Sequence, residues 1–119
     1  MTLPSEGALL RIYIGESDRH AGMLLYEWIV RTAREQGLAG ATVLRGVEGF
    51  GARSRVRTAK ILELSTDLPI VVELVDSANK IEAFLPLVDA AIVDGMATVE
   101  RVQIRFYRSR AEVSGGTAH

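Results

Sequence analysis

The sequence predicts an α+β fold of the ferredoxin-like type, with βαββαβ order, one antiparallel sheet and both helices on one face. Two stretches show the apolar spacing of amphipathic helices, and the stretches around them alternate as strands do. The chain of 119 residues suffices for one domain and has no cysteine, so an apolar core must stabilise it without disulfides. We expect a polar lead-in over residues 1–8, the domain over residues 9–108 and a disordered tail over residues 109–119.

The first βα unit begins with a strand predicted over residues 9–14, whose isoleucines and Leu10 face the core. The Gly-Glu-Ser-Asp sequence that follows is typical of a turn, so Ser17 or Asp18 is expected to cap the next helix. That helix is predicted over residues 22–36, and the glycine after it suits a left-handed C-terminal cap. Its apolar stripe consists of Leu25, Trp28, Ile29 and Ala33.

The second strand is predicted over residues 41–48, with Ala41, Val43 and Val47 on its core face. A Gly- and Arg-rich loop follows over residues 49–58. The antiparallel partner of this strand is predicted in two pieces, separated by a turn or bulge at Asp-Leu-Pro: residues 59–64 and residues 70–75.

The second helix is expected to begin after a Ser77 cap, and Pro86 inside it should kink or split it. Its apolar stripe consists of Ile81, Phe84, Leu85, Val88 and Ile92. The last strand is predicted over residues 97–107. On this strand the residues expected to point inward are Val102, Ile104 and Phe106, and those expected to point outward are Arg101, Gln103 and Arg105.

The sheet face opposite the helices is expected to be half apolar. The apolar residues on it are Leu9, Tyr13, Leu44, Val71 and Val75. Such a face is either covered by a partner subunit or simply solvated, and the pattern leaves both alternatives open.

Charge and hydropathy exclude several classes of protein. The formal net charge is −1, whereas nucleic-acid binders usually have a basic excess. No apolar run is long enough to span a membrane, and the N-terminus lacks the pattern of a signal peptide. We therefore expect a cytoplasmic protein with no nucleic-acid partner and no membrane insertion.

The Gly- and Arg-rich loop is the most informative feature of the sequence. No acid occurs from residue 52 to residue 60, where Arg53, Arg55 and Arg57 alternate with other residues. Glycines let backbone N–H groups approach an anion, and arginines offer planar forked donors to phosphate. The alternative is a solvated hairpin tip whose charges serve solubility. The loop matches neither a P-loop nor a dinucleotide-binding glycine pattern.

The sequence gives only weak signals for a catalytic or metal-binding group of residues. The absence of cysteine excludes thiol catalysis and thiolate zinc sites. His20 is a candidate general base, a ligand or an ordinary surface residue, and the other histidine, His119, ends the tail. Glu48 and Glu63 could face each other across the hairpin, but nothing fixes the separation of an acid–base pair. We therefore predict no catalytic residue and no metal ligand.

Three stretches of the sequence resemble the nitrogen regulatory PII proteins and, more closely, a PII-like family known as domain of unknown function number 190. They read Leu-Arg-Ile-Tyr-Ile-Gly-Glu-Ser-Asp at residues 10–18, Gly-Ala-Thr-Val-Leu-Arg-Gly-Val-Glu-Gly-Phe-Gly at residues 40–51 and Asp-Leu-Pro-Ile-Val-Val-Glu at residues 67–73. The resemblance implies a homotrimer whose sheets face inward and whose intersubunit clefts hold a small ligand, typically an adenine nucleotide. Some members of this family are encoded beside fluoride channels, which suggests a membrane channel or transporter as the protein partner.

The predicted ligand is thus an adenine nucleotide or another anion. PII proteins grip phosphates with a Gly- and Lys-rich loop after the second helix, but residues 93–98 here contain one acid and no base. The loop arginines are the better candidates for phosphate contacts. The predicted ligand-binding residues are Thr42, Gly49, Gly51, Arg53, Arg55 and Arg57.

The function predicted on this basis is that of a PII-like sensor that binds its ligand between subunits and signals through the loop to a protein target. One alternative is a metal- or ion-tolerance trimer similar to CutA, which shares the fold. Another is a small enzyme that uses the intersubunit cleft, although fold does not determine function.

Overall fold

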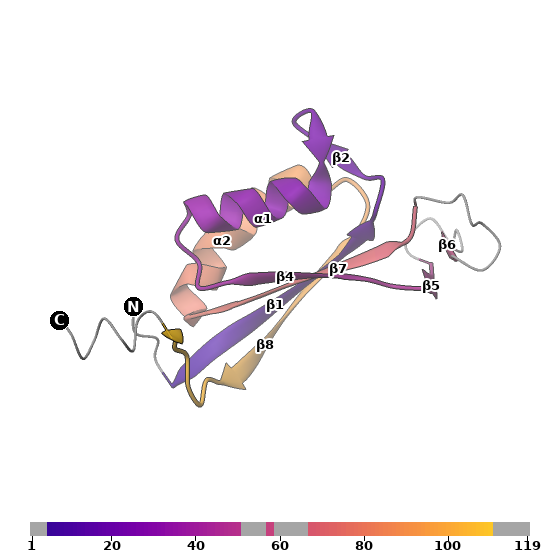
Figure 1. Ribbon diagram of the computed structural model, residues 1–119. Coiled ribbons are helices and arrows are strands. Elements are labelled where there is room, and N and C mark those ends of the chain that lie inside the picture. The colour runs from indigo at the N-terminus through magenta and orange to yellow at the C-terminus, as the bar shows by residue number, and fades with distance from the viewer. Residues whose placement is uncertain (1–4, 51–56, 59–66, 111–119) are drawn as a thin grey trace.

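A four-stranded antiparallel sheet with two helices on one face forms the body of the protein (Figure 1). The computed structural model describes residues 5–50, 57–58 and 67–110. β1 (Glu6–Gly15) lies between β7 (Pro69–Asp76) and β8 (Met96–Gln103), and β4 (Ala41–Arg45) pairs with the other side of β7. This strand order, β4-β7-β1-β8, confirms the predicted ferredoxin-like α+β fold.

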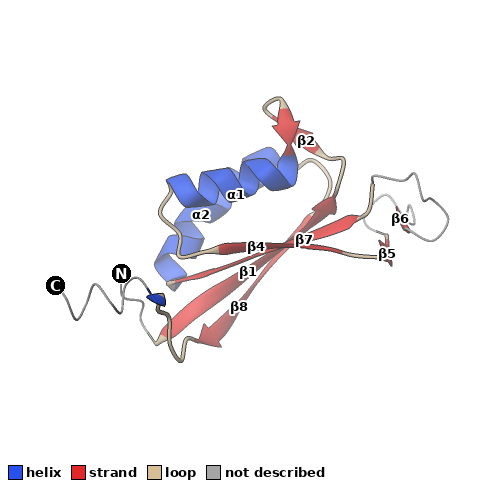
Figure 2. Cartoon of the chain, in the orientation of Figure 1, coloured by secondary structure: helices blue, strands red, loops and turns tan. Residues whose placement is uncertain are grey.

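Both helices pack on the same side of this sheet, and two short hairpins extend from it (Figure 2). The helices are α1 (Leu25–Glu35) and α2 (Ala78–Ala91). One hairpin pairs β2 (Arg19–His20) with β3 (Met23–Leu24) ahead of α1. The other pairs β5 (Glu48–Gly49) with β6 (Arg57–Thr58) beyond the end of β4.

The core lies between the helices and the two central strands. Alternate residues of β1 and β7 point into it, as the period of two predicts. The strand residues buried there include Leu10, Ile12, Ile14, Ile70, Val72 and Leu74. Those from the helices include Leu25, Ile29, Ala33, Ile81, Phe84 and Val88, so both predicted helical stripes are confirmed as core faces. Trp28, Leu85 and Ile92 are partly buried against this core.

The start of α1 differs from the prediction. The helix begins at Leu25, and no side chain caps it, so the prediction that Ser17 or Asp18 serves as the cap is wrong. The Asp18 carboxylate instead accepts the N–H of Gly15 at 2.8 Å, within the turn after β1. The β2–β3 hairpin occupies the intervening residues, and its turn has positive φ angles at residues 21 and 22.

The two strands predicted to form the central hairpin are confirmed in part. Residues 70–75 do form the antiparallel partner of β4, whereas residues 59–64 lie outside the described part of the chain. β4 ends at Arg45, and Val47 is 77% exposed, so its predicted place on the core face is wrong. The N–H of Gly46 still donates to the carbonyl of Pro69 at 2.7 Å, but a proline has no N–H to donate in return, so the regular pairing ends here.

The helix α2 is capped as predicted, since the Ser77 hydroxyl accepts the N–H of Lys80 at 3.3 Å. Pro86 does not split it. The helix continues as one element to Ala91, with the proline ring on its exposed side. A proline on the outer side of a helix keeps its lost hydrogen bond away from the core.

The side chains of the last strand, β8, lie on the opposite faces of the sheet from those predicted. It ends at Gln103, and its pairing places Arg101 opposite Ala8 on the helix side and Val102 opposite Gly7 on the open side. Residues directly opposite in an antiparallel pair share a face, so the predicted inward and outward sets are exchanged. Phe106, which was expected inward, is 70% exposed and lies beyond the strand.

The segment after β8 passes from one sheet edge to the other. The N–H of Ile104 donates to the carbonyl of Ser5 at 2.6 Å, which holds the segment near the start of β1. The hydroxyl of Tyr107 then donates to the carbonyl of Ala39 at 2.8 Å, immediately ahead of β4. This segment therefore bounds the open face of the sheet at the end distant from the β5–β6 hairpin.

Candidate functional site

The open face of the sheet has an uninterrupted apolar row. The strand register places one residue from each strand in this row: Leu44, Val71, Tyr13 and Met96. Leu44 is 48% exposed and Met96 is 56% exposed, so the two ends of the row are open to solvent. An apolar row across all four strands is a surface that a second protein chain could cover.

The neighbouring row on the same face is polar. It consists of Thr42, Glu73, Arg11 and Thr98. Arg11 Nε donates to Glu73 Oε2 at 2.9 Å, and Arg11 Nη1 donates to Glu100. The hydrogen bond to Glu73, followed by that to Glu100, raises the pKa of Arg11 above its ordinary value. One guanidinium therefore contacts two carboxylates within a single chain, and the cluster keeps a net charge of −1.

A cleft of about 380 Å³ adjoins this polar row. Thr42, Glu73 and Val75 line it from the sheet, and Phe106 and Tyr107 line it from the segment after β8. Thr42 is the predicted ligand-binding residue that falls in this cleft. The cleft offers a hydroxyl and aromatic surface, but its charged side chain, Glu73, does not favour an anion.

A second polar cluster lies where the chain leaves the sheet after β4. Arg45 Nη2 pairs with Glu16 Oε2, and the other Glu16 oxygen accepts the N–H of Leu68 at 3.3 Å. Ser17 Oγ donates to Asp67 Oδ1 at 2.6 Å, beside this pair. The end of β1, the end of β4 and the start of β7 are therefore tied together by side chains.

The structure brings some predicted ligand-binding residues together and separates others. Gly49 and Arg57 are paired across the β5–β6 hairpin. Thr42 lies instead on the open face of β4, in the polar row. Gly51, Arg53 and Arg55 lie outside the described residues, so their assignment remains a prediction.

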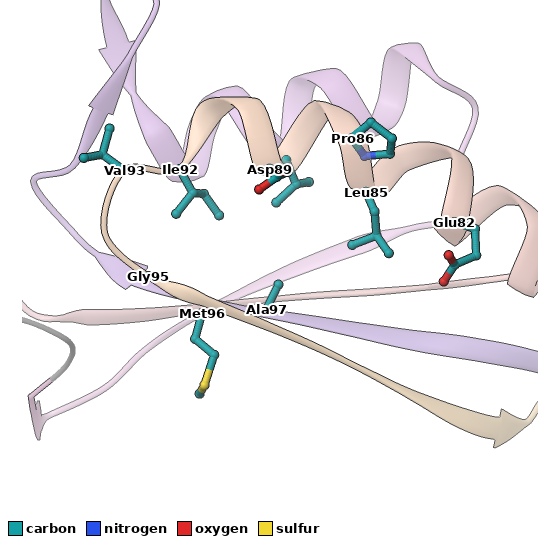
Figure 3. Close-up of a pocket in the computed structure, with 10 residues that line it drawn as sticks. Glu82, Leu85, Pro86, Asp89, Ile92, Val93, Gly95, Met96 and Ala97 are labelled. Atoms are coloured by element: carbon teal, nitrogen blue, oxygen red, sulfur yellow. The ribbon is translucent and has the colours of Figure 1, made fainter.

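A groove of about 590 Å³ runs between α2 and β8 (Figure 3). Leu85 and Ala97 point into it from the two elements, whereas Met96 points away to the open face. Its lining includes the carboxylates of Glu82 and Asp89 and, among the described residues, no basic side chain. A lining with two carboxylates does not favour an anion in this groove.

His20 belongs to the β2–β3 hairpin, where its ring stacks edge-on against Trp28 with 4.5 Å between centroids. Across residues 5–50, 57–58 and 67–110, no group of three or more His, Cys, Asp or Glu side chains is placed to hold a metal ion. No helix in the same ranges is long and apolar enough to cross a membrane.

Sequence reasoning missed both ion-pair clusters. Arg11, Glu73 and Glu100 come from three strands, and only the strand register brings them together. The Glu16–Arg45 pair joins residues 29 positions apart. One signal was available, because both residues lie within the stretches that resemble the PII-like family.

The fold is that of PII-like proteins. CPII from Thiomonas intermedia K12, described as a nitrogen regulatory PII-like protein bound to ADP, AMP and bicarbonate, has a TM-score of 0.58 against this chain. The alignment covers 83% of this chain and 88% of CPII at 16% identity. Another CPII structure, bound to ADP and bicarbonate, gives a TM-score of 0.50 at 19% identity, over 82% and 88% of the two chains.

Sequence comparison specifies the family. The family described as uncharacterized ACR, COG1993, or DUF190, matches residues 7–104, and the chain belongs to it. A UPF0166 protein of Aquifex aeolicus is 36% identical over 96 residues, which cover 81% of this chain and 90% of that protein. A UPF0166 protein of Methanocaldococcus jannaschii is 38% identical over 78 residues, or 66% and 71% of the two chains.

Proposed function

We propose that this protein is a PII-like sensor. It assembles as a homotrimer, binds an adenine nucleotide or another small anion such as bicarbonate between subunits, and transmits the bound state to a protein partner. The single observation on which the proposal rests is the apolar row on the open face of a PII-like sheet. The ADP, AMP and bicarbonate bound to CPII suggest the class of ligand.

The charges beside the apolar row are compatible with its burial. Covering an unpaired charge is costly, whereas a charge that already has a hydrogen-bonded partner can be covered at lower cost. Arg11 pairs with Glu73 and Glu100 within its own chain. Each of these three groups therefore already has a hydrogen-bonded partner when a second copy covers the row, and the cluster keeps one net negative charge.

The proposal requires ligand binding and no chemical change in the ligand. Recognition of an anion needs donors, and the arginines between β5 and β7 supply them in the sequence. These residues belong to the segment of the chain that joins β4 to β7, two strands that contribute to the apolar row. Ligand contacts there would affect the same strands that meet the neighbouring subunit. The partner of such a sensor would be a protein, of which a membrane channel or transporter is the class that the family resemblance suggests.

Calorimetric titration with ADP, AMP and bicarbonate tests the proposed binding. We expect the wild type to bind at least one of them. Each charge-assisted hydrogen bond that is shielded from water contributes roughly 1.5–3 kcal/mol to binding. Loss of one arginine should therefore weaken binding about tenfold or more. The variants are Arg53→Ala, Arg55→Ala and Arg57→Ala. The matched control is Arg34→Ala, which removes an exposed arginine from the last turn of α1.

Two results would count against the proposed binding. If the wild type binds none of the three compounds, the proposed ligand class is wrong. If it binds one and all three loop variants match the control within twofold, the loop arginines form a solvated surface and the site lies elsewhere.

A further inference from the structure

Arg45 occupies an unusual position at the end of β4. Its backbone is fixed, because the next residue, Gly46, donates its N–H to Pro69 at 2.7 Å. A Cβ on Gly46 would lie only 2.8 Å from Pro69 Cγ, which shows how closely the two segments approach. The Arg45 side chain nevertheless remains 61% exposed. A fixed backbone with an exposed guanidinium is an arrangement suited to binding a ligand from solvent.

Its partner, Glu16, is buried where Arg45 is exposed. The Glu16 side chain is only 10% exposed, and its carboxylate accepts the N–H of Leu68 in addition to the Arg45 guanidinium. A carboxylate in such a place is already supported by backbone hydrogen bonding. The contact between the pair uses one nitrogen of a guanidinium that has five N–H donors. Arg45 therefore has both the exposure and the donors for a second anion.

We propose that Arg45 is an anion-binding residue that contacts the phosphate or carboxylate group of the ligand, and that the buried Glu16 carboxylate opposes this binding. This inference rests on the proposed function, and it adds Arg45 to the loop arginines as a contact for the ligand. A ligand anion and Glu16 attract the same guanidinium, while the two negative charges repel each other. Glu16 thus sets how strongly an anion is held at the end of β4.

The two substitutions that follow have opposite expected effects. Arg45→Gln removes a charged donor, so affinity should fall roughly tenfold. Glu16→Gln keeps an oxygen for the Leu68 N–H but removes the competing charge, so affinity should rise roughly threefold or more. If the pair were only structural, either substitution would loosen the same three strand ends. Binding would then weaken in both variants.

The experiment is calorimetric titration of ADP, AMP and bicarbonate into the wild type, Arg45→Gln, Arg45→Lys, Glu16→Gln and Arg31→Gln. Arg31 is an exposed arginine of α1, so its variant should bind as the wild type does. Arg45→Lys keeps the charge opposite Glu16 and loses the fork geometry, so it should fold and should bind about threefold more weakly. Thermal unfolding of each variant shows whether the fold persists.

Opposite shifts for the two neutral variants support the proposal. Binding by Arg45→Gln within twofold of the wild type overturns it, and so does a loss in Glu16→Gln as large as that in Arg45→Gln. If both neutral variants fail to fold, Arg45→Lys decides, because unchanged affinity there overturns the proposal. A wild type that binds none of the three compounds instead refutes the proposed function, and this inference with it.

Discussion

Replacement of Val71 by aspartate should dissociate the assembled protein into single chains. Val71 lies in the apolar row between Leu44 and Tyr13, on β7, one of the two central strands of the sheet. In one chain its side chain is half-buried, and a covering subunit would remove the remainder from water. An aspartate there would place a carboxylate against the neighbouring subunit with no counter-ion in its own row.

The size of the effect can be worked from these contacts. Complete burial of a valine contributes roughly 1.5 kcal/mol or more, and about half of that is already obtained in the single chain. A buried charge without a partner adds a penalty of roughly 3–5 kcal/mol. The sum is about 4–6 kcal/mol for each copy, which corresponds to about a thousandfold to ten-thousandfold in the association constant at about 1.4 kcal/mol per factor of ten.

Light scattering at micromolar concentration measures this change directly. The wild type should have three times the 13.0 kDa mass of one chain, and Val71→Asp should have the mass of one chain. Val71→Thr keeps the shape without the charge and should remain assembled. Val93→Asp adds the same charge at a residue that is 94% exposed and outside the sheet, and should also remain assembled. A Val71→Asp protein that is folded and retains the wild-type mass would refute the assignment of this face to the interface.

Two further predictions concern the stability of the single chain. Gly95→Ala should lower the free energy of unfolding by roughly 1–3 kcal/mol, because at φ 156° the added Cβ would lie 2.7 Å from the carbonyl oxygen of Tyr13. Urea denaturation measures this free energy, and a variant as stable as the wild type would contradict the prediction. Ser77→Ala should cost about 1 kcal/mol, because the N–H of Lys80 loses its capping acceptor; Ser77→Thr is the matched control, and equal losses in both variants would show that the cap is not the cause.

Local pattern predicted the central elements of this fold correctly. β1 alternates from Ala8 to Ile14, and its inward residues are almost completely buried. Ser77 and the apolar stripe after it specify α2 without reference to distant residues. These features could be predicted because period and capping are properties of neighbouring residues.

The errors arose where a distant contact overrides the local pattern. Ser17 and Asp18 are good capping residues, but the β2–β3 hairpin intervenes before α1 begins. The N–H of Leu25 donates to the Asp18 carbonyl at 2.7 Å. On β8, the alternation of Val102 and Ile104 suggested the wrong face. Pairing with β1 fixes the register there, because Val99 lies opposite Leu10.

The site was harder to predict than the fold for the same reason. Thr42 could be selected only from the family resemblance, and its neighbours Glu73 and Arg11 are known only from the register of three strands. The pairing of Glu16 with Arg45 likewise depends on how the strand ends meet. Composition could identify the arginine-rich loop as a candidate, but composition contains no information on which strand ends lie together.

Native mass spectrometry of the wild-type protein, purified from its own host, shows whether the protein is a trimeric sensor, because it reports subunit number and retained ligand together. A PII-like sensor should give a mass of three 13.0 kDa chains, with an adenine nucleotide or another small anion retained on part of the population. A single-chain mass at micromolar concentration, unchanged after addition of ADP, AMP and bicarbonate, would contradict the account.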